Sequence, residues 1–93
     1  MSQSDDLERL LALLGGDRDL LEQLRQAGFL PREPARLSPE HAELARVAHT
    51  LVHELEVNWA GVEVALHLRG RLIALEAQMS ELVVVLNRRS RER

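Results

Sequence analysis

Apolar residues recur along the last third of the chain at alternating steps of three and four residues. The series consists of Ala65, Leu68, Leu72, Leu75, Met79, Leu82 and Leu86. This spacing is an unbroken apolar heptad seam, which is typical of a helix that packs against another helix in a coiled coil. It predicts one long helix from Asn58 to about Arg88, roughly 45 Å long at the standard rise per residue.

A helix of that length exceeds the diameter of a domain built from 93 residues, so its distal half lacks a surface of its own to pack on. If the seam stayed in water, the chain would lose the free energy of burial, about 1.5–3 kcal/mol for each large side chain. We therefore predict a homodimer in which the two long helices are antiparallel or crossed. The predicted dimer interface consists of Leu68, Leu72, Leu75, Met79, Leu82 and Leu86.

Two short helical patterns precede this segment. The first has leucines at the spacing of one amphipathic face from Leu7 to Leu14, and Gly15-Gly16 ends it. Asp17 is placed to cap a second helix, which ends at Gly28. Two short helices joined by a glycine turn predict a helix-turn-helix unit.

The middle of the chain predicts a loop and a third helix. Residues 31–37 contain two prolines and alternating charges, which indicates a loop or a small wing. Ser38-Pro39-Glu40 is a strong helix start, and the helix should run to Leu55 with its apolar face buried. The fold class is therefore predicted as all-α, with residues 1–57 as a winged helix-turn-helix-like domain, 58–88 as the dimerisation helix and 89–93 as a basic tail.

Charge is distributed unevenly along the chain, whose net charge is −3. Residues 1–57 carry −5, and residues 58–93 carry +2. The acids that we consider for partner binding are Asp17, Asp19, Glu22, Glu40 and Glu43. An acidic surface opposes DNA binding, because affinity for DNA depends on cationic side chains that neutralise phosphates. The alternative is that these acids only solubilise the domain and cap its helices.

The stretch from His49 to Leu68, with the block Asn58-Trp59-Ala60-Gly61-Val62 at its centre, resembles the CbpM-type chaperone modulators. Residues 17–30 resemble the second helix and following turn of MerR-type winged-helix proteins, the broader group. The resemblance covers about residues 7–86. It implies a MerR-like winged helix-turn-helix with a long dimerisation helix, and a protein that binds the J-domain of a DnaJ-type co-chaperone and controls its work with DnaK. It equally admits a factor that assembles DnaK with DnaJ.

A DNA-binding transcription regulator of the MerR type is the third interpretation, and the sequence departs from it. Glu22 stands where DNA-binding members commonly have an arginine, and residues 31–37 lack their Gly-Tyr-Arg element. We therefore regard nucleic acid as an improbable partner of this chain.

Few residues suggest other chemistry. His49 and His53 have a spacing that can bind zinc, but the sequence offers no third ligand, so we expect no metal and no cofactor. No catalytic constellation is evident, which predicts a protein that is not an enzyme. The chain contains no cysteine and no stretch apolar enough to span a membrane, so we expect a cytoplasmic protein.

Overall fold

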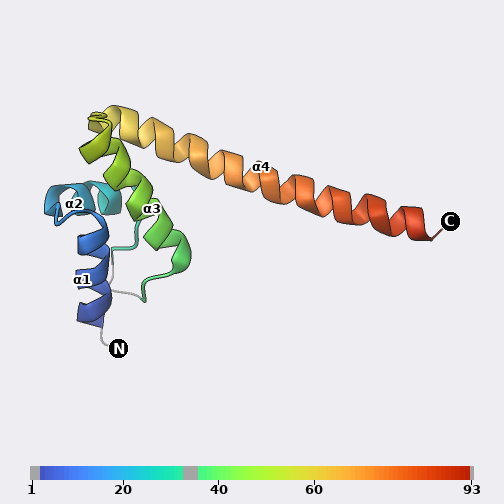
Figure 1. Cartoon of the computed structure of the whole chain (residues 1–93), viewed down its shortest axis with the longest axis horizontal. Helices are drawn as coiled ribbons and strands as arrows, with labels where there is room; N and C mark the ends of the chain where they lie inside the picture. Colours follow the sequence, from blue (N-terminus) through green and yellow to red (C-terminus); the bar gives the residue numbers. More distant parts are fainter. Residues whose placement is uncertain (1–2, 33–35, 93) are drawn as a thin grey trace. The chain divides into compact units, whose positions relative to one another are not determined.

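The computed structural model describes residues 3–32 and 36–92. These residues form helices only, without any strand, which confirms the all-α prediction (Figure 1). The predicted wing lies partly outside the described residues, because residues 33–35 belong to it. The helices are α1 (Gln3–Leu13), α2 (Arg18–Gln26), α3 (Pro39–His49) and α4 (Trp59–Arg91), with a π-helical segment η1 (Thr50–Glu54) between α3 and α4.

The ends of α2 follow the capping chemistry of the sequence. The Asp17 side chain accepts a hydrogen bond from the Leu20 backbone N–H at 3.0 Å, which satisfies one of the free donors of the first turn. At the other end, the Phe29 N–H donates to the Leu24 carbonyl at 2.9 Å across Gly28, whose φ is +86°. A positive φ at this position is the usual reason for glycine after a helix.

α3 begins as predicted, because the Ser38 hydroxyl caps it by accepting from the His41 N–H at 3.0 Å. It does not continue as an α-helix to Leu55. After His49 the chain widens into η1, and the Leu55 N–H donates to the Thr50 carbonyl five residues back at 3.0 Å. Leu55 is 63% exposed, so the prediction that the third helix buries this residue is wrong.

The turn into α4 has a defined backbone. Glu56 has a φ of +55°, and the Val57 N–H donates to the Leu51 carbonyl at 2.8 Å. Asn58 then caps α4 through a 2.9 Å hydrogen bond from the Gly61 N–H to its Oδ1 atom. A larger residue at Gly61 would force the Val57 side chain to move, because a Cβ atom would lie 2.6 Å from one of its methyl carbons.

Two compact units divide the chain, Met1–Glu63 and Val64–Arg93. In the first unit, α1 and α3 lie side by side (Figure 1). The core of this unit is made of buried leucines, alanines and one valine: Leu10, Leu14, Leu20, Leu21, Leu24, Leu30, Ala45, Ala48 and Val62. The second unit is the continuation of α4, a helix of 33 residues in all that ends three residues beyond the predicted Arg88.

Candidate functional site

Two of the predicted partner-binding acids form an exposed acidic pair on α2. Asp19 and Glu22 are three residues apart, so their side chains lie on one side of the helix, and both residues are exposed. Gln26, one turn further, donates a hydrogen bond to a Glu22 carboxylate oxygen at 3.5 Å. This side of α2 is polar throughout, because Leu20, Leu21 and Leu24 occupy the buried side.

Asp17, the third acid of this group, has a structural role. Besides capping α2, its Oδ2 atom lies 2.9 Å from Nε2 of His53. The hydrogen bond from the Leu20 N–H and the contact with His53 lower the pKa of Asp17 below its ordinary value. Its side chain is only 24% exposed, so it adds less to the acidic surface than Asp19 and Glu22 do.

The other two candidates lie on α3. Glu40 is exposed in the first turn of that helix, and Glu43 is exposed and pairs with Arg46 at 3.2 Å. The pair compensates the charge of Glu43 locally, which leaves Glu40 as the uncompensated acid of the two. The strongest acidic feature among the predicted residues is therefore the Asp19–Glu22 pair, which we call the α2 acidic face.

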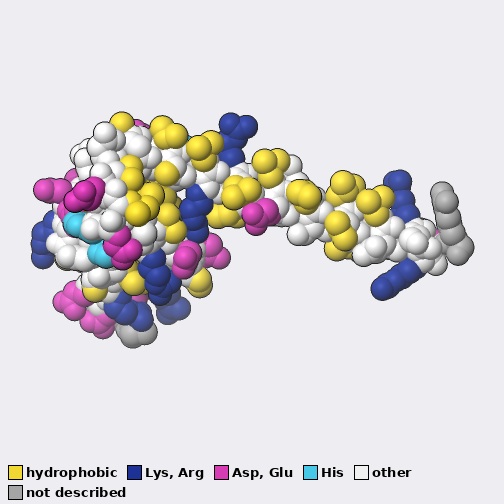
Figure 2. Space-filling model, turned by 45° about the horizontal axis from the view of Figure 1, so that its top comes forward, with side chains coloured by type: hydrophobic (Ala, Val, Ile, Leu, Met, Phe, Trp, Pro, Cys, Tyr) yellow, Lys and Arg dark blue, Asp and Glu magenta, His cyan; other side chains and the backbone are white. Residues whose placement is uncertain are grey.

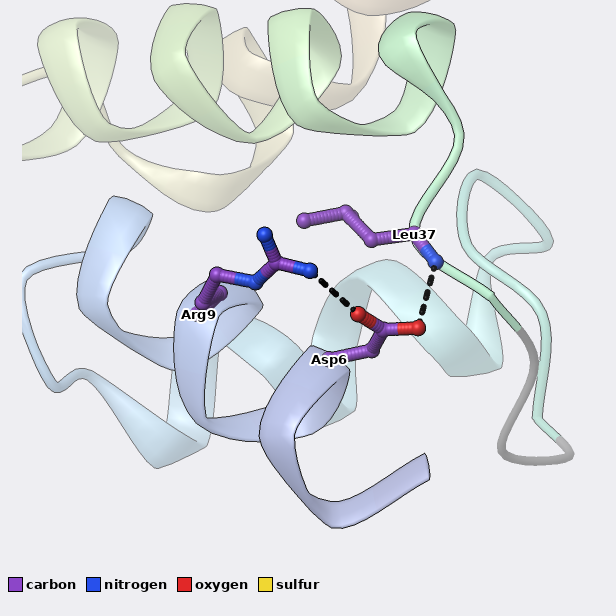
Figure 3. Close-up of polar contacts among 3 residues, drawn as sticks. All are labelled: Asp6, Arg9 and Leu37. Atoms are coloured by element: carbon purple, nitrogen blue, oxygen red, sulfur yellow. Dashed lines mark hydrogen bonds and ion pairs between the residues drawn. The ribbon is translucent and has the colours of Figure 1, made fainter. Parts of the chain in front are cut away.

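Asp6 is an acid whose role the sequence did not reveal, because the helix dipole alone explains an acid in the first turn of α1. It is only 7% exposed. One carboxylate oxygen accepts from Arg9 at 2.7 Å, and the other accepts from the Leu37 backbone N–H at 3.3 Å (Figure 3). The hydrogen bond from Arg9 is the main cause that lowers the pKa of Asp6. The carboxylate therefore stays charged, and it connects α1 to the segment before α3.

The two histidines on α3 and η1 lie at the turn between α1 and α2. The rings of His49 and His53 have centroids 5.0 Å apart, and His53 contacts Asp17. His49 packs so closely on Gly15 that a Cβ atom there would lie 2.9 Å from its ring. Across the described ranges, no three potential ligands are grouped as a metal site would require.

An open groove of about 460 Å³ lies between α1 and α3. Its apolar floor includes Ala12, Leu13, Pro39 and Ala42, and Arg9 and Arg46 line it as well. Both arginines already pair with carboxylates of their own helices, Asp6 and Glu43. The groove is thus lined largely by apolar residues, and its polar residues are already engaged: the two arginines in these ion pairs and the Ser38 hydroxyl in the cap of α3.

The predicted interface residues on α4 form a large exposed apolar surface. Leu68, Leu72, Leu75, Met79, Leu82 and Leu86 are 54–66% exposed in the single chain. Figure 2 shows hydrophobic side chains along much of this helix. Exposed apolar patches of this extent mark interaction sites in soluble proteins.

Further exposed apolar residues on α4 lie outside the heptad seam. Ile73 is 49% exposed, and Val83, Val84 and Val85 are 43–53% exposed. The three valines surround most of the helix near its C-terminal end, because successive residues are about 100° apart around a helix axis. Such a helix requires cover on more than one side.

In the chain as described, no helix is long and apolar enough to cross a membrane. Comparisons with protein-family models, with curated proteins and with solved structures find no match to this chain. The function is therefore inferred from the surfaces described above.

Proposed function

We propose that the protein is a homodimeric chaperone modulator that binds the J-domain of a DnaJ-type co-chaperone through the α2 acidic face. The observation that carries the proposal is the exposure of Asp19 and Glu22 together on the polar side of α2. The resemblance of residues 7–86 to CbpM-type chaperone modulators supplies the class of partner. J-domains of this class present a basic helix, so the charges of the two surfaces are complementary.

Electrostatic attraction between such surfaces accelerates encounter and orients the partners. The mechanism that follows is competition. A J-domain whose basic helix is covered by α2 has no free surface with which to engage DnaK. The alternative, a factor that assembles DnaK with DnaJ, uses the same contact but leaves DnaK a second binding surface on the complex.

The α4 surface supports the homodimer. On each helix, six seam residues are exposed by more than half. Two such helices can together bury on the order of 1,000 Å² of surface, which is the size expected of a specific contact. A dimer carries two α2 acidic faces and so binds two J-domains. A DNA-binding function has less support, because two acids, Asp19 and Glu22, are among the exposed residues of α2.

The test is the charge reversal Asp19→Arg with Glu22→Arg. We expect association with a purified J-domain to slow by about tenfold at low ionic strength, and the difference from the wild type to shrink as salt screens the charges. The matched control is Glu8→Arg with Glu54→Arg, which changes the net charge equally at two exposed positions outside the α2 acidic face. Circular dichroism confirms that both variants fold.

Equal rates for the wild type and the α2 variant would refute the proposal, and equal slowing in both variants would reduce it to an effect of net charge. Adding DnaK to the preformed complex separates the two chaperone functions: displacement indicates a modulator, and a ternary complex indicates an assembly factor. Selection of an enriched, nanomolar DNA motif from a random duplex library would favour the transcription regulator instead.

A further inference from the structure

The side chains of Asp17, His49 and His53 form a cluster that the proposed function does not use, and we call it the histidine cluster. Nε2 of His53 lies 2.9 Å from Oδ2 of Asp17, which is a hydrogen-bond distance. The rings of His53 and His49 have centroids 5.0 Å apart, and the His49 ring lies against Gly15. Asp17 and His53 are 36 positions apart, so their contact connects the start of α2 to η1.

The two carboxylate oxygens of Asp17 have separate partners. Oδ1 accepts from the Leu20 N–H at 3.0 Å and caps α2, whereas Oδ2 faces His53. The hydrogen bond from the Leu20 N–H, and then the contact with His53, lower the pKa of this carboxyl from 3.8. Asp17 therefore stays ionised over the range in which histidine rings gain and lose a proton. Within that range, the charge on the ring decides the strength of the contact.

Protonation of His53 strengthens its contact with Asp17. A neutral ring with its proton on Nε2 donates one hydrogen bond to the carboxylate. A protonated ring donates the same hydrogen bond and adds the attraction between opposite charges. The side chains of His53 and Asp17 are 41% and 24% exposed, so water weakens this attraction without removing it.

His49 limits the positive charge that the cluster accommodates. Two protonated rings 5.0 Å apart repel each other, so the cluster takes up one proton more readily than two. His53 gains most from that proton, because it is the ring in contact with the carboxylate. Among the described residues, the titratable groups that contact the His53 ring are Asp17 and His49. The charged residues that adjoin Asp17 and His53 in sequence are exposed: Arg18, Glu54 and Glu56.

We propose that the contact between His53 and Asp17 is a pH-sensitive clasp, which protonation of His53 tightens and which ties η1 to the start of α2. Its contribution to folding stability is greatest in mild acid and decreases as the pH rises through the range of histidine titration. Asp19 lies in the first turn of α2, so the clasp also holds the start of the α2 acidic face. The clasp does not depend on what this face binds, and the inference thus goes beyond the proposed function.

Two variants separate the clasp from the helix cap. His53→Gln removes the titrating ring, and Asp17→Asn removes the charge but retains a side chain that caps helices as well as aspartate does. The unfolding constant of each chain is measured in urea at about pH 8 and about pH 5.5, at one protein concentration. Between these two conditions, we expect the unfolding constant of the wild type to fall about threefold relative to that of either variant. His41→Gln, at a histidine of α3 outside the cluster, should behave as the wild type does.

The Leu20 amide provides a second readout, which requires no variant to fold. It donates to the carboxylate that His53 contacts, so its NMR signal in the wild type should shift together with the ring signals of His53 as the pH changes. A Leu20 signal that stays constant while the His53 ring titrates would show that Asp17 does not respond to the proton, and would overturn the proposal.

The stability measurements can overturn it as well. The same pH dependence in the wild type, His53→Gln and Asp17→Asn would show that the contact does not respond to pH. A wild type that loses stability in mild acid relative to both variants would reverse the predicted sign. No step of the experiment involves a J-domain, so the clasp and the chaperone function fail or succeed separately.

Discussion

Gly15 and Gly16 are adjacent residues with similar positive φ angles and different surroundings. Their φ angles are +69° and +76°, values that residues with side chains rarely adopt. The space beside Gly15 is occupied by the ring of His49, whereas nothing lies within 4 Å of a Cβ atom at Gly16. The ring of His49 on α3 therefore packs against this turn at Gly15.

Replacing these glycines by alanine separates backbone strain from packing. Gly16→Ala is expected to cost about 1–2 kcal/mol of unfolding free energy from the left-handed backbone alone. Gly15→Ala introduces the same strain and must also displace His49, which adds at least about 1 kcal/mol. Urea unfolding of both variants measures the difference, and equal losses would show that His49 moves aside freely.

A residue whose role depends on a partner distant in sequence could not be assigned that role from the sequence. The caps at Asp17 and Ser38 were predictable, because each bonds a backbone N–H only three residues away. The burial of Asp6 was not, since the Leu37 N–H that it accepts from is 31 residues distant. The candidate acids were found as a set, but only the structure separates the exposed Asp19 from the half-buried Asp17.

At the scale of elements, the sequence predicts the helix caps and the glycine turns, and the end of α3 departs from the prediction. The pattern of Leu51 and Val52 continues the apolar face of α3, so an α-helix to Leu55 was the natural expectation. The structure instead has a π-helical turn, which contains extra residues per turn and rotates Leu55 into solvent. Such a turn leaves little trace in the periodicity of a five-residue segment.

The connection between α1 and the segment before α3 depends on the ionised Asp6 and is therefore sensitive to pH. Its pKa is lowered from 3.8 in the folded chain, so below that pH the unfolded chain binds more protons. Folding stability from this carboxylate is present above 3.8 and disappears as the pH falls through the folded-state value.

Asp6→Asn is accordingly expected to be less stable than the wild type at neutral pH, because the charge that pairs with Arg9 is absent. The difference in stability should shrink as the pH falls below 3.8. It should vanish below the lowered pKa of the folded chain, where the wild-type carboxylate is also neutral. Thermal unfolding across this range measures it, with Glu8→Gln as the control for an exposed acid of the same helix. A difference that persists unchanged in acid would assign the effect to packing.

At the scale of the whole molecule, the chain consists of a compact unit, Met1–Glu63, and a second unit that continues α4 and exposes many large apolar side chains. The seam residues from Leu68 to Leu86 are all more than half exposed in the single chain, and their burial between subunits stays a prediction. The heptad periodicity alone predicted the end of this helix to within three residues.

Leu75→Arg tests the association as a whole, because Leu75 lies near the middle of the seam. Losing its burial in both copies removes about 3–6 kcal/mol, and the introduced charges oppose each other, so dissociation should increase at least about a hundredfold. Light scattering at micromolar concentration should give twice the 10.5 kDa of one chain for the wild type and a single chain for the variant. Ala77→Arg, on the same helix but outside the seam, should remain a dimer, which distinguishes loss of the interface from a general effect of an added arginine. If the wild type itself has the mass of one chain, the exposed surface of α4 must meet a different protein, and the homodimer is excluded.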